Sequence, residues 1–269
     1  MKLHGLFGRP FMDLSGLIDT SGFAAMDREI SLALATLDCD GTGATLKSMG
    51  VVAPWVMGDG RRDAREALRA LSEGELADFL SLGDGEVSEE ALRDRDFGDE
   101  TDHPFTRAQQ RWLEVRHGVY FPWRTCFHLL ANDRWDDKHR GDGKGFDEDA
   151  LALMPLTCAF VSSLPFTEIG RCVLFGLGPH DHAPLHRDSE PGEVLEVAQS
   201  INFAPRPGKR FYLQNDPDAA PVVIDRPIYW FNDMDYHGVL ADPFFRYSLR
   251  VDGVFARDFV RALERAARG

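Results

Sequence analysis

The sequence predicts an α+β fold in which helices flank a β core of the sandwich or jelly-roll type. Two patterns indicate this fold. Helix-capping signals dominate up to about residue 150, and short apolar runs separated by Pro and Gly follow from about residue 151. Strands this short and frequent are not typical of folds in which each strand is followed by a helix.

Two capping boxes mark predicted helices in the first part of the chain. Ser72 with Glu75, and Thr106 with Gln109, have the spacing at which an N-cap hydroxyl and the side chain three residues later each bond the other's main-chain N–H. An apolar run follows each box, which is typical of a helix that packs one face on a core.

Short apolar segments of the second part predict strands, and the last segment of the chain predicts an amphipathic helix. We expect Phe259, Leu263 and Ala266 to form the apolar stripe of that helix. The predicted strands are residues 171–178, 197–203, 210–215, 220–225, 228–233 and 245–255.

The same change of pattern predicts two regions. Residues 1–150 form a mainly helical region, and residues 151–269 form the β core with a C-terminal helix. The charged, Gly-rich stretch 132–149 at the end of the first region reads as an exposed loop.

Composition limits the classes of partner. The chain has 269 residues and a formal net charge of −14, which disfavours binding to nucleic acid because the phosphate backbone is also negative. No stretch approaches 18 apolar residues, so we expect no membrane span. The cysteines are widely spaced and form no C-x-x-C pair, so we expect reduced thiols in a cytoplasmic protein. They are Cys39, Cys126, Cys158 and Cys172.

Two histidines and one carboxylate have the spacing of a metal site. His186 and Asp188 form an H-x-D unit, and residues two apart in an extended segment project to the same side. His237 lies 49 residues further on, after the predicted strand 228–233. Two imidazoles and one carboxylate can hold Fe(II) on one side and leave positions open on the other.

A possible anchor for a carboxylate follows nine residues after His237. Arg246 and Ser248 lie on the same face of a predicted strand, because side chains alternate along it. A guanidinium suits a carboxylate because it donates two parallel hydrogen bonds, and a hydroxyl can add a third. Arg250 lies on the same face and is the second choice for this role, since no Ser follows it at the same spacing.

The order H-x-D, H, R-x-S resembles the motif of Fe(II)- and 2-oxoglutarate-dependent oxygenases, over roughly residues 160 to 255. Two segments, LPFTEIGRCVLFGLGPHDHAPLHRD and YWFNDMDYHGVLADPFFRYSLRVDG, are also similar in layout to the aspartyl/asparaginyl and proline hydroxylases. The resemblance implies a double-stranded β-helix core, which is a jelly-roll or cupin-like fold, with the first 150 residues shaping the substrate pocket.

By this resemblance, His186, Asp188 and His237 bind iron and form the catalytic centre, and Arg246 with Ser248 holds the distal carboxylate of 2-oxoglutarate. The implied reaction uses O2 to hydroxylate an amino acid, a peptide side chain or a small metabolite, while 2-oxoglutarate is decarboxylated to succinate. Desaturation or cyclisation would use the same ligands, so the substrate and the reaction type stay open.

Three alternatives remain. His180 and His182 form an H-x-H unit of the kind found in cupin metal sites, which would give a metal enzyme that does not use 2-oxoglutarate. A β-barrel binding protein that keeps a metal without catalysis is the second. The third is a phosphatase, because residues 38–42 spell D-x-D-G-T, in which the first Asp would be the nucleophile. No α/β alternation follows that motif, so we expect a loop there.

Overall fold

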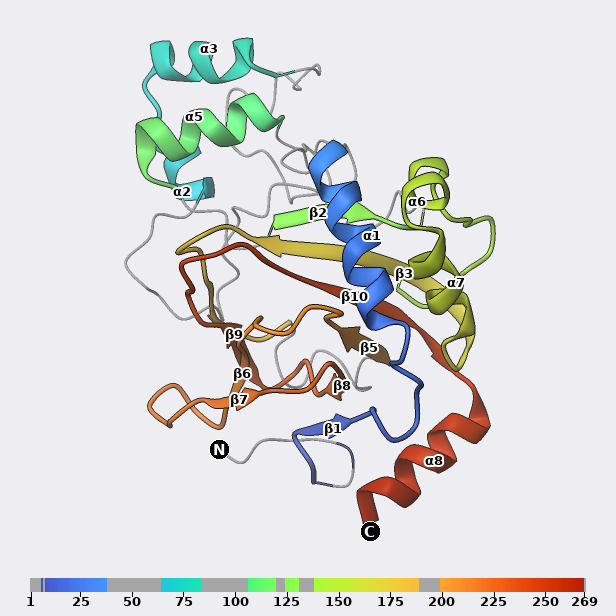
Figure 1. Ribbon diagram of the computed structural model, residues 1–269. Helices are drawn as coiled ribbons and strands as arrows, with labels where there is room; N and C mark the ends of the chain where they lie inside the picture. Colours follow the sequence, from blue (N-terminus) through green and yellow to red (C-terminus); the bar gives the residue numbers. More distant parts are fainter. Residues whose placement is uncertain are drawn as a thin grey trace.

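Three layers make up most of the molecule (Figure 1). In the computed structural model, helices cover one face of a larger antiparallel sheet, and a smaller antiparallel sheet packs on its other face. The residues described are 6, 8–37, 64–83, 106–119, 124–130, 138–188 and 199–268. Their mixed helix and antiparallel-sheet content confirms the predicted α+β class.

Ten strands lie within the described residues. The larger sheet has the order β1 (Phe11–Asp13), β8 (Ile228–Phe231), β5 (Ser200–Phe203), β10 (Arg246–Phe255), β3 (Phe166–Leu177) and β2 (Arg124–His128). The smaller sheet has the order β4 (Ala183–His186), β9 (Tyr236–Val239), β6 (Phe211–Gln214) and β7 (Val222–Ile224).

From β3 to β10 the chain passes repeatedly between the two sheets. Strands β3, β5, β8 and β10 lie in the larger sheet, whereas β4, β6, β7 and β9 lie in the smaller one. Loops that connect the sheets therefore gather at their edges, where they can bring together residues that are distant in sequence.

Four helices pack on the outer face of the larger sheet and share one apolar core with it. Three other helices form a separate small core at one end of the molecule (Figure 1). The first group is α1 (Phe23–Thr36), α6 (Glu148–Leu153), α7 (Pro155–Ser163) and α8 (Arg257–Arg268). The second group is α2 (Ala64–Arg69), α3 (Glu73–Ser81) and α5 (Arg107–His117).

Both capping boxes are confirmed: Ser72 accepts a hydrogen bond from the main chain of Glu75 at the start of α3, and Thr106 accepts one from Gln109 at the start of α5. The tail helix is also confirmed, but its stripe is corrected by one residue. Ala267 is buried and Ala266 is exposed, because the position four after Leu263 returns to the same face of a helix.

The predicted strands are found as β3, β5, β6, β7, β8 and β10, with shifted ends. Four further strands have no counterpart in the prediction: β1, β2, β4 and β9. Strand β2 pairs with β3 and β1 pairs with β8, so the first 150 residues also contribute to the larger sheet. The division into two regions near residue 150 stays a prediction.

Strand β10 explains how the fold creates a polar interior. Tyr247, Leu249 and Val251 face the helices and belong to the main apolar core. The alternate side chains face the smaller sheet and are polar, yet they are also buried. These inward residues are Arg246, Ser248, Arg250 and Asp252. Because buried charges must be paired, this row requires partners from the loops around it.

Two of the cysteines are buried thiols, as expected. Cys158 and Cys172 are free, and burial raises the pKa of Cys158 to about 11 and that of Cys172 well above its ordinary value. Cys39 and the side chain of Cys126 lie outside the described residues. Among the residues described, no helix has the length and apolar character needed to cross a membrane.

Candidate metal centre

The predicted metal ligands meet where β4 ends beside β9. His186 is the last residue of β4 and pairs in register with His237 of β9. Gly238 allows this approach, because a Cβ at that position would lie 2.7 Å from the carbonyl oxygen of Ala183. The two imidazole rings lie with their centroids 4.2 Å apart.

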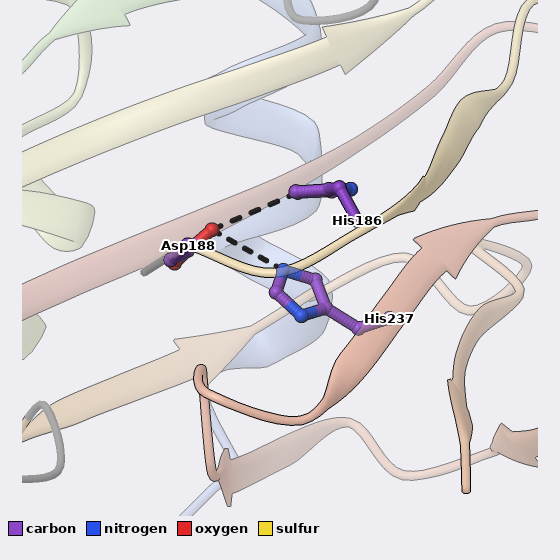
Figure 2. A group of neighbouring side chains, drawn as sticks. All are labelled: His186, Asp188 and His237. Atoms are coloured by element: carbon purple, nitrogen blue, oxygen red, sulfur yellow. Dashed lines mark ion pairs between the residues drawn. The ribbon is translucent and has the colours of Figure 1, made fainter. Parts of the chain in front are cut away.

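Asp188 completes the group from the segment after β4 (Figure 2). Its Oδ1 lies 3.3 Å from Nε2 of His237 and 3.6 Å from Nε2 of His186. The main-chain N–H of Asp188 donates to the carbonyl oxygen of Asp233 at 3.0 Å, which holds this segment against the end of β8. Within the described part of the chain, this is the one group of three or more His, Cys, Asp or Glu side chains close enough to share an ion.

The tautomer of each histidine follows from its main-chain partner. Nδ1 of His186 lies 2.7 Å from the carbonyl oxygen of Pro184, and Nδ1 of His237 lies 2.8 Å from that of Asp235. A carbonyl can only accept, so each Nδ1 carries the proton. In a neutral ring the lone pair is then on Nε2, which in both residues faces Asp188, as a metal ligand requires.

Arg250 holds the other oxygen of Asp188. Its Nη1 donates to Oδ2 of Asp188 at 2.6 Å, its Nη2 to Oδ2 of Asp233 at 3.1 Å, and its Nε to Oδ1 of Asp252 at 2.9 Å. Each nitrogen of this buried guanidinium therefore contacts a different carboxylate. The Asp188 carboxylate is fixed with Oδ2 on Arg250 and Oδ1 on the side of the imidazoles.

The charge network continues to Arg171 on β3. Its Nε and Nη2 donate to Oδ2 of Asp252 at 2.8 and 2.7 Å, and both side chains are almost fully buried. Arg171 and Arg250 together oppose three carboxylates: Asp188, Asp233 and Asp252. Lys138 also lies close enough to interact with Asp188 and Asp252, so this network contains three basic and three acidic side chains.

The protonation states of His186 and Asp188 favour the binding of a metal cation. Burial, followed by the neighbouring His237, lowers the pKa of His186, so that this ring stays neutral. Burial alone would raise the pKa of Asp188, but Arg250 and then His237 hold it well below its ordinary value. Neutral imidazole and ionised carboxylate are the forms that bind a metal.

These donors fit a divalent transition metal. Two imidazole nitrogens and one carboxylate oxygen on one side of a site form the facial arrangement in which Fe(II) keeps open positions. Their main-chain and Arg250 contacts orient all three before any ion arrives.

The two residues predicted to anchor 2-oxoglutarate lie further along β10. Ser248 is buried and accepts a hydrogen bond from Nζ of Lys209. Arg246 is buried too, but its guanidinium donates to main-chain carbonyl groups of two loops. Arg250, the second choice for the anchor, donates instead to Asp188, the predicted carboxylate ligand. The anchoring role of Arg246 and Ser248 stays a prediction.

Sequence reasoning missed Lys209, Asp233 and Arg171. Arg171 and Asp252 carried a usable signal, because each is a charged residue within an otherwise apolar strand segment, and a charge there requires a partner. Lys209 precedes β6 in a stretch with many polar residues, where a lysine is ordinarily a surface residue.

The H-x-H motif does not join the site. His180 is exposed and His182 is half-buried, and neither belongs to the group that could share an ion. The backbone of His180 adopts a left-handed conformation with φ of 65°, and its N–H donates to the carbonyl oxygen of Asp242. The D-x-D-G-T motif at residues 38–42 lies outside the described residues.

Comparison with known proteins does not show a family. The chain matches no protein-family model and no curated protein.

Solved structures give weak similarities. An oxidoreductase of the 2OG-Fe(II) oxygenase family from Burkholderia pseudomallei is 14% identical with a TM-score of 0.31, over 48% of this chain and 66% of that chain. A prolyl hydroxylase from Trichoplax adhaerens, in complex with a hypoxia inducible factor peptide fragment, is 16% identical with a TM-score of 0.29, over 50% and 74%. A cupin domain from Bordetella pertussis is 10% identical with a TM-score of 0.23, over 30% and 78%. Values this low do not establish a shared activity.

We predict that His186→Ala, Asp188→Ala and His237→Ala each weaken binding of Fe(II) by more than about 100-fold, because each removes one of three ligands. Anaerobic isothermal titration calorimetry measures the affinity. His182→Ala is the matched control and should bind Fe(II) like the unchanged protein. Wild-type affinity in any of the three ligand variants would exclude that residue from the centre.

We also predict that Arg250→Met lowers the free energy of unfolding by about 3–5 kcal/mol, because it removes the cation shared by the buried Asp233 and Asp252 and the half-buried Asp188. Urea denaturation of the metal-free protein measures this change. In the control, Arg226→Met breaks the exposed Arg226–Asp13 ion pair and should cost less than about 1 kcal/mol. Equal costs for the two substitutions would contradict the role given to Arg250.

Proposed function

We propose that this protein is an Fe(II)- and 2-oxoglutarate-dependent oxygenase that hydroxylates an amino acid, a peptide side chain or a small metabolite. The observation that carries the proposal is the centre itself. Nε2 atoms of His186 and His237 and Oδ1 of Asp188 converge from β4, β9 and the segment after β4, with their other polar atoms already bonded. Iron held this way supplies open coordination positions for a 2-oxo acid and O2.

Strand topology supports the finer fold assignment, a double-stranded β-helix of the jelly-roll or cupin-like type with flanking helices. Strands β3 to β10 divide equally between two four-stranded units, with the orders β8-β5-β10-β3 and β4-β9-β6-β7, and only β6 and β7 are consecutive within one unit. In this arrangement the ligands lie between the sheets, at the edge where β4 and β9 meet. The loops at that edge can then enclose a substrate next to the metal.

Charge supports an anionic cosubstrate. Arg171, Arg250 and Lys138 face the three carboxylates Asp188, Asp233 and Asp252, so a divalent cation beside Asp188 leaves the network with an excess of positive formal charge. A ligand with a negative charge is then favoured next to the ion. A 2-oxo acid meets this requirement, because its carboxylate and oxo group can both reach one metal ion.

In this proposal the protein's own residues hold and orient the reactants. Arg250 prevents the Asp188 carboxylate from turning, and the carbonyl oxygens of Pro184 and Asp235 prevent the imidazoles from turning. Such contacts fix the positions of the metal-binding atoms, and this keeps the reacting atoms of the cosubstrate and the substrate in place during oxidation of the substrate. Arg246 and Ser248 are the positions that the R-x-S motif assigns to the distal carboxylate of the cosubstrate.

For the substrate, we propose an amino-acid or peptide side chain, as in the aspartyl/asparaginyl or proline hydroxylase branch. The support is the layout of residues 164–188 and 229–253 in the sequence. We further propose that residues 1–150 shape the substrate pocket and that residues 151–269 form the catalytic core.

We predict that 2-oxoglutarate added anaerobically to the Fe(II)-loaded protein produces a weak visible absorption band at about 500 nm, as expected for a 2-oxo acid that chelates iron in a facial site. Anaerobic absorption spectroscopy measures it, and admission of O2 should then yield succinate. Asp188→Asn, which removes the ligand's charge but keeps its shape, is the control and should give no band. Iron binding without a band in the unchanged protein would favour a metal protein that does not use 2-oxoglutarate.

A further inference from the structure

Arg187 lies between two of the predicted metal ligands in the sequence. The side chains of His186 and Asp188 point to one place, where they meet His237 (Figure 2). Because neighbouring side chains of an extended segment point to opposite sides, Arg187 is directed away from that place. It is nevertheless buried, with 6% of its surface exposed. Burial of a guanidinium is costly, so this position requires a structural explanation.

Arg187 stacks on the aromatic ring of Tyr236. The guanidinium carbon of Arg187 lies over this ring, 3.8 Å from its centroid. Such a contact combines stacking of two planar groups with the attraction between a cation and the π electrons. The attraction is stronger where water is largely excluded, as it is around the buried Arg187. Tyr236 directly precedes His237, so both members of the stack are next to metal ligands in the sequence.

The register of β4 and β9 explains how the two residues meet. His186 pairs with His237 in this antiparallel ladder, and continuing the register by one residue places Arg187 opposite Tyr236. Side chains directly opposite each other lie on the same face of a sheet. The two imidazoles and the stack are therefore consecutive cross-strand pairs on opposite faces of the smaller sheet.

The pairing of these strands is irregular close to the ligands. Ala183 pairs with Val239 and His186 with His237, but the register shifts between these two pairs. Main-chain pairing in so short a ladder constrains His186 weakly, so a side-chain contact at its end adds a constraint where the ligands lie. Tyr236 is itself held from the other side, because it pairs with Gln214 of β6.

We infer that Arg187 and Tyr236 are positioning residues for the metal centre, and that their stack is a brace that fixes the two ligand-bearing strands relative to each other. The brace acts through the main chain of the neighbouring ligands and not by contact with the ion. This inference rests on the metal centre of the proposed function and does not depend on which cosubstrate or substrate binds there.

The test uses Co(II), whose visible absorption and electron paramagnetic resonance spectra report the geometry of its ligands. The ion is titrated into the unchanged protein and into Arg187→Met, which keeps a long apolar side chain but removes the planar cation. The variant should bind Co(II) about 10- to 100-fold more weakly, as is usual when a group that orients a metal ligand is removed. Both spectra should also change, because the ligands are no longer held in one geometry.

Variants of Tyr236 show whether the stack is the cause. Tyr236→Phe keeps the ring face and should bind Co(II) like the unchanged protein, whereas Tyr236→Leu should resemble Arg187→Met in affinity and spectra. Because the two side chains form one contact, the double variant should bind no more weakly than either single variant. Arg226→Met is the matched control in an exposed ion pair with Asp13, and it should leave Co(II) binding unchanged.

A purely structural role of the stack gives a different result. Arg187→Met would then lower the thermal midpoint of unfolding of the metal-free protein, but the folded variant would keep the Co(II) affinity and spectra of the unchanged protein. That result, or additive losses of affinity in the double variant, would overturn the inference while the metal centre stands. If the unchanged protein binds no Co(II), the metal centre is wrong, and the proposed function fails together with the brace.

Discussion

The structure depends on one buried guanidinium shared by three carboxylates. Arg250 contacts Asp188 after β4, Asp233 after β8 and Asp252 on its own strand. Each of these acidic groups would be costly to bury without a cation beside it, so moving Asp188 or Asp233 away from Arg250 costs the ion pair that it makes there. The segments that follow β4 and β8 are therefore held in a fixed relation to β10.

This constraint also sets the chemistry of the site. With Oδ2 on Arg250, Asp188 has Oδ1 directed to the imidazoles, whose Nδ1 atoms are committed to carbonyl oxygens. Each inward-facing side chain of β10 then makes a different contact. Arg246 donates to carbonyl groups of two loops, Ser248 accepts from Lys209, Arg250 orients Asp188, and Asp252 joins the arginines of β3 and β10.

Sequence reasoning could predict that His186, Asp188 and His237 lie together, because the chemistry of a metal ion restricts the spacing and residue types of its ligands. Strands β4 and β9, each of four residues, are too short to give an alternation signal, and the ligand pattern alone indicated them. Alternation also placed Arg246, Ser248 and Arg250 correctly on one face. Alternation could not predict which groups the guanidinium of Arg246 or of Arg250 contacts, because those groups lie on loops from other parts of the chain.

The same limit explains why the contact between Lys209 and Ser248 was not predicted. It joins two sheets across 39 positions of sequence, which no local pattern encodes. The error of one residue in the C-terminal helix has a different origin. Ala266 and Ala267 are adjacent alanines, so residue type does not distinguish them, and only their angular positions around the helix show which one is buried.

The central claim is that His186, Asp188 and His237 hold one divalent ion through two Nε2 atoms and one carboxylate oxygen. Crystals grown with Mn(II), which tolerates air, test it most directly through the anomalous scattering of the metal. We predict one strong peak within about 2.3 Å of both Nε2 atoms and of Oδ1 of Asp188, with Arg250 still on Oδ2. An ion bound elsewhere, or no peak between these three side chains at saturating Mn(II), would contradict the account.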